Sequence, residues 1–249
     1  MKITLLGTNG WYDTENGSTT CVLVQASQYD IIFDAGYGFS KIDQYTLGER
    51  PAYLFLSHQH LDHLIGLHVL PKFHFTQGLT VTGQPGTRHA LEALLDSPFA
   101  VPISNHRFPV RVIDLPEIQD QLPFGLTALP LIHSGPCQGY RLEIDGRVIA
   151  YCTDTGYCAN AVTLARDADL LVCECSQAPG SQPKEEWPHL NPTLAARIAS
   201  EAGAKQLALI HFDPSQYPTL ASRKGAQEEA CRVFPNTIAG QDGMTFELS

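Results

Sequence analysis

The segment Ser57–His63 is the part of the chain best equipped for chemistry, because it holds three histidines and one aspartate directly after an apolar run. His58 and His60 are two residues apart, so on extended backbone their imidazoles point the same way and can share one cation. Asp62 and His63 are adjacent and are expected to open a helix, where their side chains fan away toward a second cation. Imidazole and carboxylate ligands favour Zn²⁺, Mn²⁺ or Fe over Ca²⁺ and Mg²⁺.

Two ions need more ligands than four residues supply, and three further residues of the ligand type occur downstream. His133, Asp154 and His211 each directly follow an apolar run that is predicted to be a strand. Loops that leave the same edge of a sheet converge, so these side chains are expected to meet. Each of them alone could be an ordinary surface or core residue. Together with the upstream segment, all three are predicted to be metal ligands.

The hydrophobic pattern predicts the elements that must position these residues. Helices are predicted after Asp62 and at residues 88–95, 159–166, 192–202 and 220–232. The dipeptide Asp145-Gly146 predicts a type I′ hairpin turn. Short apolar runs between turn residues predict strands at 3–6, 21–24, 31–33, 53–56, 79–82, 110–113, 126–132, 140–144, 148–151, 170–174, 206–210, 237–238 and 244–247. Hairpins precede helix–strand units, which favours two mixed sheets packed face to face with helices outside.

The composition bounds the class of protein. The chain has 249 residues, 43% of them hydrophobic, and a net charge of −10. It can therefore build a real core, and bulk nucleic-acid binding is not expected. No repeat or Gly/Ser linker divides it, so residues 1–249 are expected to form one domain. Seven cysteines without a CxxC pair predict reduced thiols. With no signal-peptide or membrane-span pattern, we expect a cytoplasmic protein without a membrane partner.

The pattern HxHxDH in Ser57–His63 resembles the signature of the metallo-β-lactamase fold superfamily of metallohydrolases. Asp34, at the end of the run 31–33, matches a strand-end aspartate of that family, and His133, Asp154 and His211 match its later motifs in order. The resemblance covers nearly the whole chain. It implies an α/β fold, a four-layer αββα sandwich of two mixed β-sheets, with a dinuclear site at one edge.

The resemblance also implies how seven ligands are shared between two divalent ions, zinc or manganese, with iron as an alternative. One ion is held by His58, His60 and His133, the other by Asp62, His63 and His211, and Asp154 bridges the two. Asp34 is expected to fix the orientation of a histidine ligand by accepting a hydrogen bond from its free ring nitrogen.

Several shorter segments resemble the ribonuclease Z-like and phosphoribosyl 1,2-cyclic phosphate phosphodiesterase branch. They are the opening turn Gly7–Gly10, with Asn9 where the branch has glycine, together with Asn16–Thr20 and Thr153–Gly156. Glu174 and His189 match the acidic residue and the downstream histidine of the branch, and in relatives that histidine helps to protonate the leaving group.

His189 also has support from its surroundings in the sequence. Asn191 is a good N-cap and Pro192 a good first helical residue, so His189 is expected just before a helix N-terminus. Such a terminus favours an anion such as phosphate. The alternative is that His189 only covers the loop, and Glu174 could equally be a surface residue at a strand end.

These features together predict a phosphodiesterase that acts on a small or cyclic phosphodiester by attack of metal-bound hydroxide. His189, oriented by Glu174, is the expected proton donor to the leaving group, and Asp62 can accept a proton from the nucleophile. A tRNA 3′-end endonuclease is the first alternative. Only 21 positions separate His133 from Asp154, however, and they leave no room for the tRNA-binding arm that such enzymes carry there.

Two other functions fit the same fold. One is hydrolysis of a thioester, a lactone or a β-lactam, and the other is metal binding without catalysis. The sequence does not name the substrate, and a homodimer is expected only because many relatives form one. Aromatic residues that could shape a pocket, most of them expected to pack in the core or in loops, are Trp11, Tyr12, Tyr37, Phe39, Phe73, Phe75, Trp187 and Tyr217.

Overall fold

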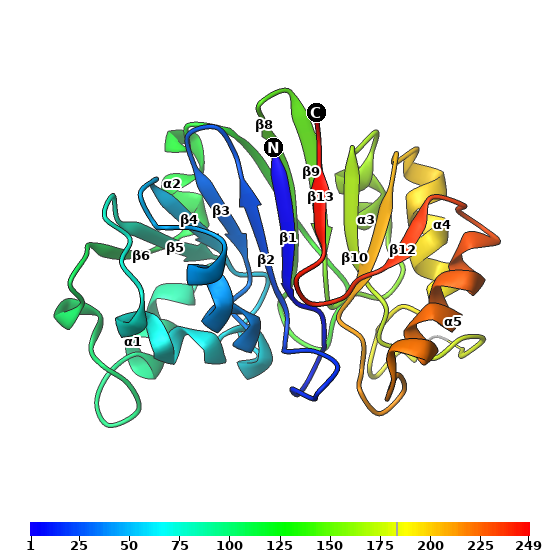
Figure 1. The fold of residues 1–249 in the computed structure, drawn as a ribbon, viewed down its shortest axis with the longest axis horizontal. Helices are drawn as coiled ribbons and strands as arrows, with labels where there is room; N and C mark the ends of the chain where they lie inside the picture. Colours follow the sequence, from blue (N-terminus) through cyan, green and yellow to red (C-terminus); the bar gives the residue numbers. More distant parts are fainter. Residues whose placement is uncertain (183) are drawn as a thin grey trace.

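Two β-sheets stand back to back at the centre of the molecule, and helices cover their outer faces (Figure 1). The structure is a computed structural model, and it describes residues 1–182 and 184–249. The arrangement confirms the predicted four-layer αββα sandwich of two mixed sheets.

The first sheet has the strand order β13-β1-β2-β3-β4-β5-β6. Its strands β13, β1, β2 and β3 pair antiparallel, whereas β3 to β6 pair parallel. The strands span Lys2–Gly7 (β1), Cys21–Gln25 (β2), Asp30–Phe33 (β3), Ala52–Phe55 (β4), Leu79–Gly83 (β5), Val110–Asp114 (β6) and Thr245–Glu247 (β13).

The second sheet has the order β12-β11-β10-β9-β8-β7. Here β12 to β9 pair parallel, and β9, β8 and β7 pair antiparallel. Its strands span Gly125–Pro130 (β7), Gln138–Ile144 (β8), Arg147–Cys152 (β9), Leu170–Glu174 (β10), Leu207–Ile210 (β11) and Thr237–Ala239 (β12). Positive φ angles at Asp145 (53°) and Gly146 (69°) agree with the predicted type I′ turn between β8 and β9.

Alternation along the strands separates three buried layers. On β10, Leu170 and Val172 face the core between the sheets, whereas Leu171 and Cys173 face the helices. β9 divides its side chains in the same way. Since both faces of these strands are buried, nearly every residue on them is apolar, as parallel strands between two layers require.

The α-helices span Thr87–Leu94 (α1), Leu115–Ile118 (α2), Ala159–Ala165 (α3), Pro192–Ala202 (α4) and Leu220–Cys231 (α5). Helices α3, α4 and α5 cover the second sheet. The first sheet is covered by α1 and by 3₁₀ helices at Tyr37–Gln44 and Ile65–Lys72, and further 3₁₀ turns lie at Leu61–His63, Ile103–Asn105 and Gln119–Gln121.

The helix predicted after Asp62 is present as two 3₁₀ segments and not as an α-helix. Two backbone hydrogen bonds explain the difference. Ala35 N–H donates to His63 O at 2.8 Å, and Gly66 N–H donates to Ala35 O at 2.9 Å. These bonds take both groups from their helical partners and dock the segment on the end of β3.

Two further expectations about the chain can be compared with the structure. All seven cysteines have free thiols, and six of them are buried. Within residues 1–182 and 184–249, none of the helices has the length and apolar character that crossing a membrane requires.

Candidate metal centre

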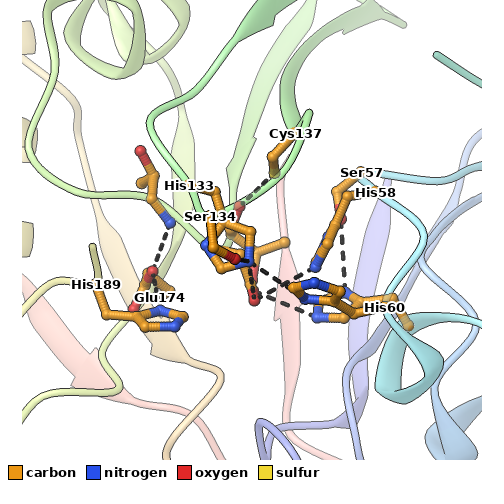
Figure 2. A network of polar contacts seen from close by, with 12 residues as sticks. Ser57, His58, His60, His133, Ser134, Cys137, Glu174 and His189 are labelled. Carbon is orange, nitrogen blue, oxygen red and sulfur yellow. Dashed lines mark hydrogen bonds and ion pairs between the residues drawn. The ribbon is translucent and has the colours of Figure 1, made fainter. Parts of the chain in front are cut away.

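Four of the predicted ligands form a first cluster at the edge where β4, β7 and β9 end. His58, His60, His133 and Asp154 offer ligand atoms that all lie within 4.8 Å of one another. Nε2 of His133 is 3.3 Å from Nδ1 of His60, and Nε2 of His58 is 3.6 Å from Oδ2 of Asp154. Figure 2 shows the His58, His60 and His133 rings turned toward one another. These are the residues expected to share one ion.

The other three form a second cluster beside the first. Asp62, His63 and His211 also lie within 4.8 Å of one another, and the Nε2 atoms of the two histidines are 3.2 Å apart. Asp154 lies between the clusters. Its Oδ1 is 3.3 Å from Nε2 of His63 and 3.1 Å from Nε2 of His211, while Oδ2 faces His58 and His133. This placement suits the bridging role expected of Asp154.

The outward nitrogens of three histidines are held by oxygen atoms behind them. Asp34 Oδ2 lies 2.8 Å from Nδ1 of His63, Ser57 Oγ lies 3.0 Å from Nδ1 of His58, and Ser176 Oγ lies 2.9 Å from Nδ1 of His211. Such partners fix the tautomer of a histidine ligand so that its other nitrogen faces the metal.

Three observations show that the donor set fits divalent cations. Nε2 of His58 is buried and has no hydrogen-bond partner. The Nε2 atoms of His63 and His211 face each other 3.2 Å apart, and the Nδ1 atom of each ring contacts an oxygen on its other side. Finally, among the described residues, no lysine or arginine pairs with the Asp62 and Asp154 carboxylates. Buried negative charge of this kind calls for a cation.

The electrostatics keep the His58 ring neutral and the two carboxylates of the site ionised. Burial, then repulsion from His63, lowers the pKa of His58 to about 2, so its ring is neutral. Burial alone would raise the pKa of Asp154, but His211 and His63 hold it well below its ordinary value. In the same way, His63 and His211 lower the pKa of Asp62 against the effect of burial. Both carboxylates therefore stay ionised.

Sharp turns at strand ends bring three of these side chains into place. Asp34, Asp154 and His211 follow β3, β9 and β11, and they have φ angles of 56°, 55° and 54°. Aspartate and histidine enter this left-handed region more readily than most residues. The turn redirects each side chain from the sheet face toward the shared edge.

Glu174 joins three segments of the site without facing either cluster. Its Oε1 accepts from Thr155 N–H at 2.5 Å and from His189 Nδ1 at 2.8 Å, and its Oε2 accepts from the backbone N–H groups of Ser176 and Leu190, both at 3.2 Å. Figure 2 shows the carboxylate behind the His189 ring. Glu174 is fully buried, so it positions His189 and does not reach the centre itself.

His189 lies next to the proposed ligands. A ring nitrogen of His189 is within 4.8 Å of ligand atoms of Asp154 and His211, and its ring stacks on His211 at 5.9 Å. Burial disfavours the charged ring, but Glu174 outweighs burial and raises the pKa of His189 to about 9. As expected, the residue precedes a helix N-terminus, where the Asn191 side chain accepts from Leu194 N–H at 2.9 Å.

Some contacts at the site carry no signal in the sequence. Trp11 N–H donates to Oδ2 of Asp62 at 2.8 Å, and the Tyr151 hydroxyl donates to Oδ2 of Asp34 at 2.7 Å. Any residue except proline could donate the first of these hydrogen bonds from its backbone, and Tyr151 lies in an apolar run that predicts a core position. Ser57 lies inside the histidine-rich segment, and the residue type alone could have marked it as a partner for a ring nitrogen.

Comparisons with known proteins agree with this geometry. The sequence profile described as "Beta-lactamase superfamily domain" matches residues 29–212. The ribonuclease Z of Acaryochloris marina is 27% identical over all of this chain and 98% of that protein. The probable metallo-hydrolase YhfI of Bacillus subtilis is 27% identical over 96% of each chain. The first alignment spans 313 positions against 249 residues here, so 64 of them have no counterpart in this chain.

Solved structures show the same architecture. The crystal structure of YhfI from Bacillus subtilis superposes with a TM-score of 0.82 and 26% identity over 98% of both chains. The short form of human tRNase Z has a TM-score of 0.75 and 22% identity over the whole of both chains, a likeness that establishes the fold alone.

Proposed function

The chain belongs to the beta-lactamase superfamily and is a metal-dependent hydrolase, and from that premise we propose that it hydrolyses a small or cyclic phosphodiester. The observation that carries the proposal is the pair formed by His189 and Glu174 beside two ligand clusters. A thioester expels a thiolate, which leaves without help from an acid, whereas the alkoxide that leaves a phosphodiester needs one.

In this proposal, His58, His60 and His133 hold one divalent ion, Asp62, His63 and His211 hold the other, and Asp154 contacts both. When bound, the ions supply positive charge for the phosphate oxygens and make water more acidic. The donor set suits zinc or manganese, with iron as a further candidate. A ring nitrogen of His189 lies beside the same centre, within 4.8 Å of ligand atoms of Asp154 and His211.

The roles of the chain's own acids and bases follow from their contacts. His189 holds a proton at neutral pH, because Glu174 raises its pKa, and donates it to the leaving oxygen. Asp62 stays ionised and, with one side chain oxygen held by Trp11 N–H, can accept a proton from the attacking water. His189 precedes the start of α4, and the positive end of that helix dipole favours an anion there.

Cleavage of tRNA is the second candidate, supported by the relatives named ribonuclease Z. The expectation that the chain avoids nucleic acid rests on its net charge and gains no support from those relatives. Against tRNA, the interval between His133 and Asp154 is filled by β8, β9 and their two-residue turn. The 64 unmatched alignment positions are also consistent with a smaller substrate.

The test is metal analysis combined with a substrate panel. We expect two equivalents of metal and hydrolysis of bis(p-nitrophenyl) phosphate and of a ribose cyclic phosphodiester, with little activity on a thioester, a lactone or a precursor tRNA. His189→Ala should slow turnover of the ribose cyclic phosphodiester, whose leaving group is an alkoxide, at least tenfold with metal content intact. Preferred cleavage of precursor tRNA would favour the second candidate. Loss of metal in His189→Ala would make His189 a ligand instead of an acid.

Three further features of the protein remain predictions: the single domain over residues 1–249, the homodimer and the cytoplasmic location.

A further inference from the structure

Trp11 adopts a backbone conformation that its side chain makes costly. Its φ angle is 64°, in the left-handed region that a bulky residue rarely enters. The conformation directs Trp11 N–H to Oδ2 of Asp62 at 2.8 Å, and glycine could provide the same N–H without strain. The indole is 69% exposed and packs edge-on against Tyr12, so core packing does not explain it. Strain without burial points to a contact outside the chain.

The second tryptophan of the chain borders the same centre. The ring of Trp187 lies 6.0 Å from the ring of His133 and 5.6 Å from that of His189, yet it is 51% exposed. The backbone of Trp11 therefore contacts the second ligand cluster, and the ring of Trp187 lies beside the first cluster and the proposed acid. The chain has only these two tryptophans.

Other apolar side chains from the segments around the site are also exposed. Of the eight aromatic residues that the sequence offered for a pocket, Phe39, Phe73, Phe75 and Tyr217 are buried, as expected of core residues. The other four are exposed. With Leu61 and Ile132, which lie next in sequence to proposed ligands, they form what we call the aromatic rim: Trp11, Tyr12, Tyr37, Trp187, Leu61 and Ile132.

We propose that Trp11 and Trp187 bind a planar ring carried by the phosphodiester substrate, in the way that aromatic side chains stack on a nucleobase. This inference rests on the proposed diesterase function and deepens it. Exposed indoles beside a phosphate-directed centre offer a π-face to any base, and such stacking is sequence-tolerant. The substrate class is then a nucleoside phosphodiester, and the rim contributes to binding, not to the chemical step.

Two substrates with the same leaving group test this inference. They are the p-nitrophenyl esters of thymidine 5′-phosphate and of methyl phosphate, which differ in the ring. Trp11→Gly and Trp187→Ala should each raise KM for the thymidine ester about tenfold relative to KM for the methyl ester. Phe99→Ala removes an aromatic ring that is 74% exposed and lies outside the rim, and should change neither. Equal effects on both esters would overturn the inference.

Stability gives a readout that does not depend on catalysis. Because Trp11→Gly removes left-handed strain and little buried surface, its midpoint of thermal unfolding should equal or exceed that of the unchanged protein. A fall of several degrees would mean that the indole stabilises the fold, and the argument from strain would fail.

Fluorescence separates this inference from the diesterase proposal. In Trp187→Phe, the emission comes from Trp11 alone, and in Trp11→Phe it comes from Trp187 alone. Titration of the metal-loaded proteins with thymidine 5′-monophosphate should quench both emissions saturably, while inorganic phosphate should not. Quenching without hydrolysis of either ester would retain the rim and reject the diesterase. Hydrolysis without quenching would reject the rim and retain the diesterase.

Discussion

The two nitrogens of each imidazole at the centre have different roles. One nitrogen points inward, and in three of the rings the other nitrogen contacts an oxygen atom. Asp34 serves several groups at once. It accepts from Ser57 N–H at 2.7 Å, from Ser57 Oγ at 2.8 Å and from the Tyr151 hydroxyl at 2.7 Å, in addition to its contact with His63. The Asp34 carboxylate is fully buried and accepts from four donors, so it fixes the orientation of the His63 ring.

At this scale, Asp34→Asn should weaken metal binding about 10- to 100-fold, because the amide is a poorer acceptor for Nδ1 of His63. The measurement is competition with a chromophoric chelator, with circular dichroism to confirm the fold. Asp43→Asn is the matched control, since Asp43 is exposed and pairs only with Lys72. Unchanged affinity in Asp34→Asn would contradict the role given to this carboxylate.

The pair formed by Glu174 and His189 predicts a pH dependence. Burial lowers the pKa of His189, and the Glu174 carboxylate raises it beyond that effect, to about 9. The protonated ring is lost as the pH rises through this pKa, so the rate should fall on the alkaline side. Glu174→Gln removes the charge, and the alkaline limb should move to lower pH by about 1–3 units.

The comparison uses pH–rate profiles of both proteins under metal saturation. Glu186→Gln, a change at an exposed neighbour of Trp187, is the control and should leave the profile in place. An alkaline limb that does not move in Glu174→Gln would exclude His189 as the acid.

Among the elements, the turn between β1 and β2 acts as a support for the second ligand cluster. Gly10 N–H donates to Phe212 O at 2.9 Å, and Phe212 N–H donates to Thr8 O at 3.0 Å, so this turn runs beside His211. A Cβ at Gly10 would lie 2.5 Å from Cε1 of His211. The approach leaves no room for any side chain.

Gly10→Ala should therefore push the His211 ring away and reduce the metal content from two equivalents toward one, while the fold persists. Elemental analysis after gel filtration measures this. Gly225→Ala, inside α5, places its Cβ in open space and should retain both ions. It should also stabilise the helix by up to about 1 kcal/mol. Full metal content in Gly10→Ala would show that His211 can move without leaving its ion.

The buried Arg223 connects α5 to the same turn. Its guanidinium donates to Thr8 Oγ1 at 2.9 Å and to Oδ1 of Asn9, and lies 4.9 Å from the centre of the Phe212 ring. Its side chain finds no carboxylate within ion-pair distance in the described part of the chain, and burial lowers the pKa of Arg223. Arg223 therefore holds the turn through neutral acceptors.

Arg223→Met should destabilise the protein by about 2 kcal/mol, because buried oxygens lose their donors. Urea unfolding followed by circular dichroism gives the free energy of unfolding. Arg107→Met, at an exposed position, should change it by less than about 0.5 kcal/mol. Greater stability in Arg223→Met would mean that burial of the cation costs more than its hydrogen bonds return.

The sequence predicted most elements, because apolar runs and turn residues are local features. The sequence did not predict the 3₁₀ form of the segment after Asp62. Backbone hydrogen bonds with Ala35 replace helical ones there, and the hydrogen-bond partner of a backbone group cannot be inferred from the residues next to it in the sequence. The proposed ligands could be predicted for a related reason, because rare residue types directly followed predicted strands. The hydrogen bond from Trp11 N–H to Asp62 could not be predicted, because only the folded chain brings together residues that are 51 positions apart.

At the scale of the whole molecule, the proposed ligands come from both sheets. Asp62 and His63 follow β4 of the first sheet, whereas Asp154 and His211 follow β9 and β11 of the second. Ions bound between them link the two sheets and stabilise only the folded state, in which the ligands meet. Removal of the ions should therefore weaken the packing of the sandwich as a whole.

Dialysis against a chelator should lower the midpoint of thermal unfolding by about 5–10 °C. This figure follows from about 2.7 kcal/mol of binding free energy at a metal concentration 100-fold above Kd. Calorimetry measures the change, and added zinc or manganese should reverse it, whereas calcium should not. If the midpoint of thermal unfolding changes with neither the chelator nor the added metal, the clusters do not bind ions.

The spread of the ligands along the chain has a consequence for biosynthesis. Five of the seven lie before residue 134, but Asp154 contacts both clusters and His211 directly follows β11 of the second sheet. A chain still emerging from the ribosome thus carries an incomplete set of donors until residue 211 has been added. Under the proposed ligand assignment, selection between competing metals in the cell would fall to the finished fold, not to the nascent polypeptide.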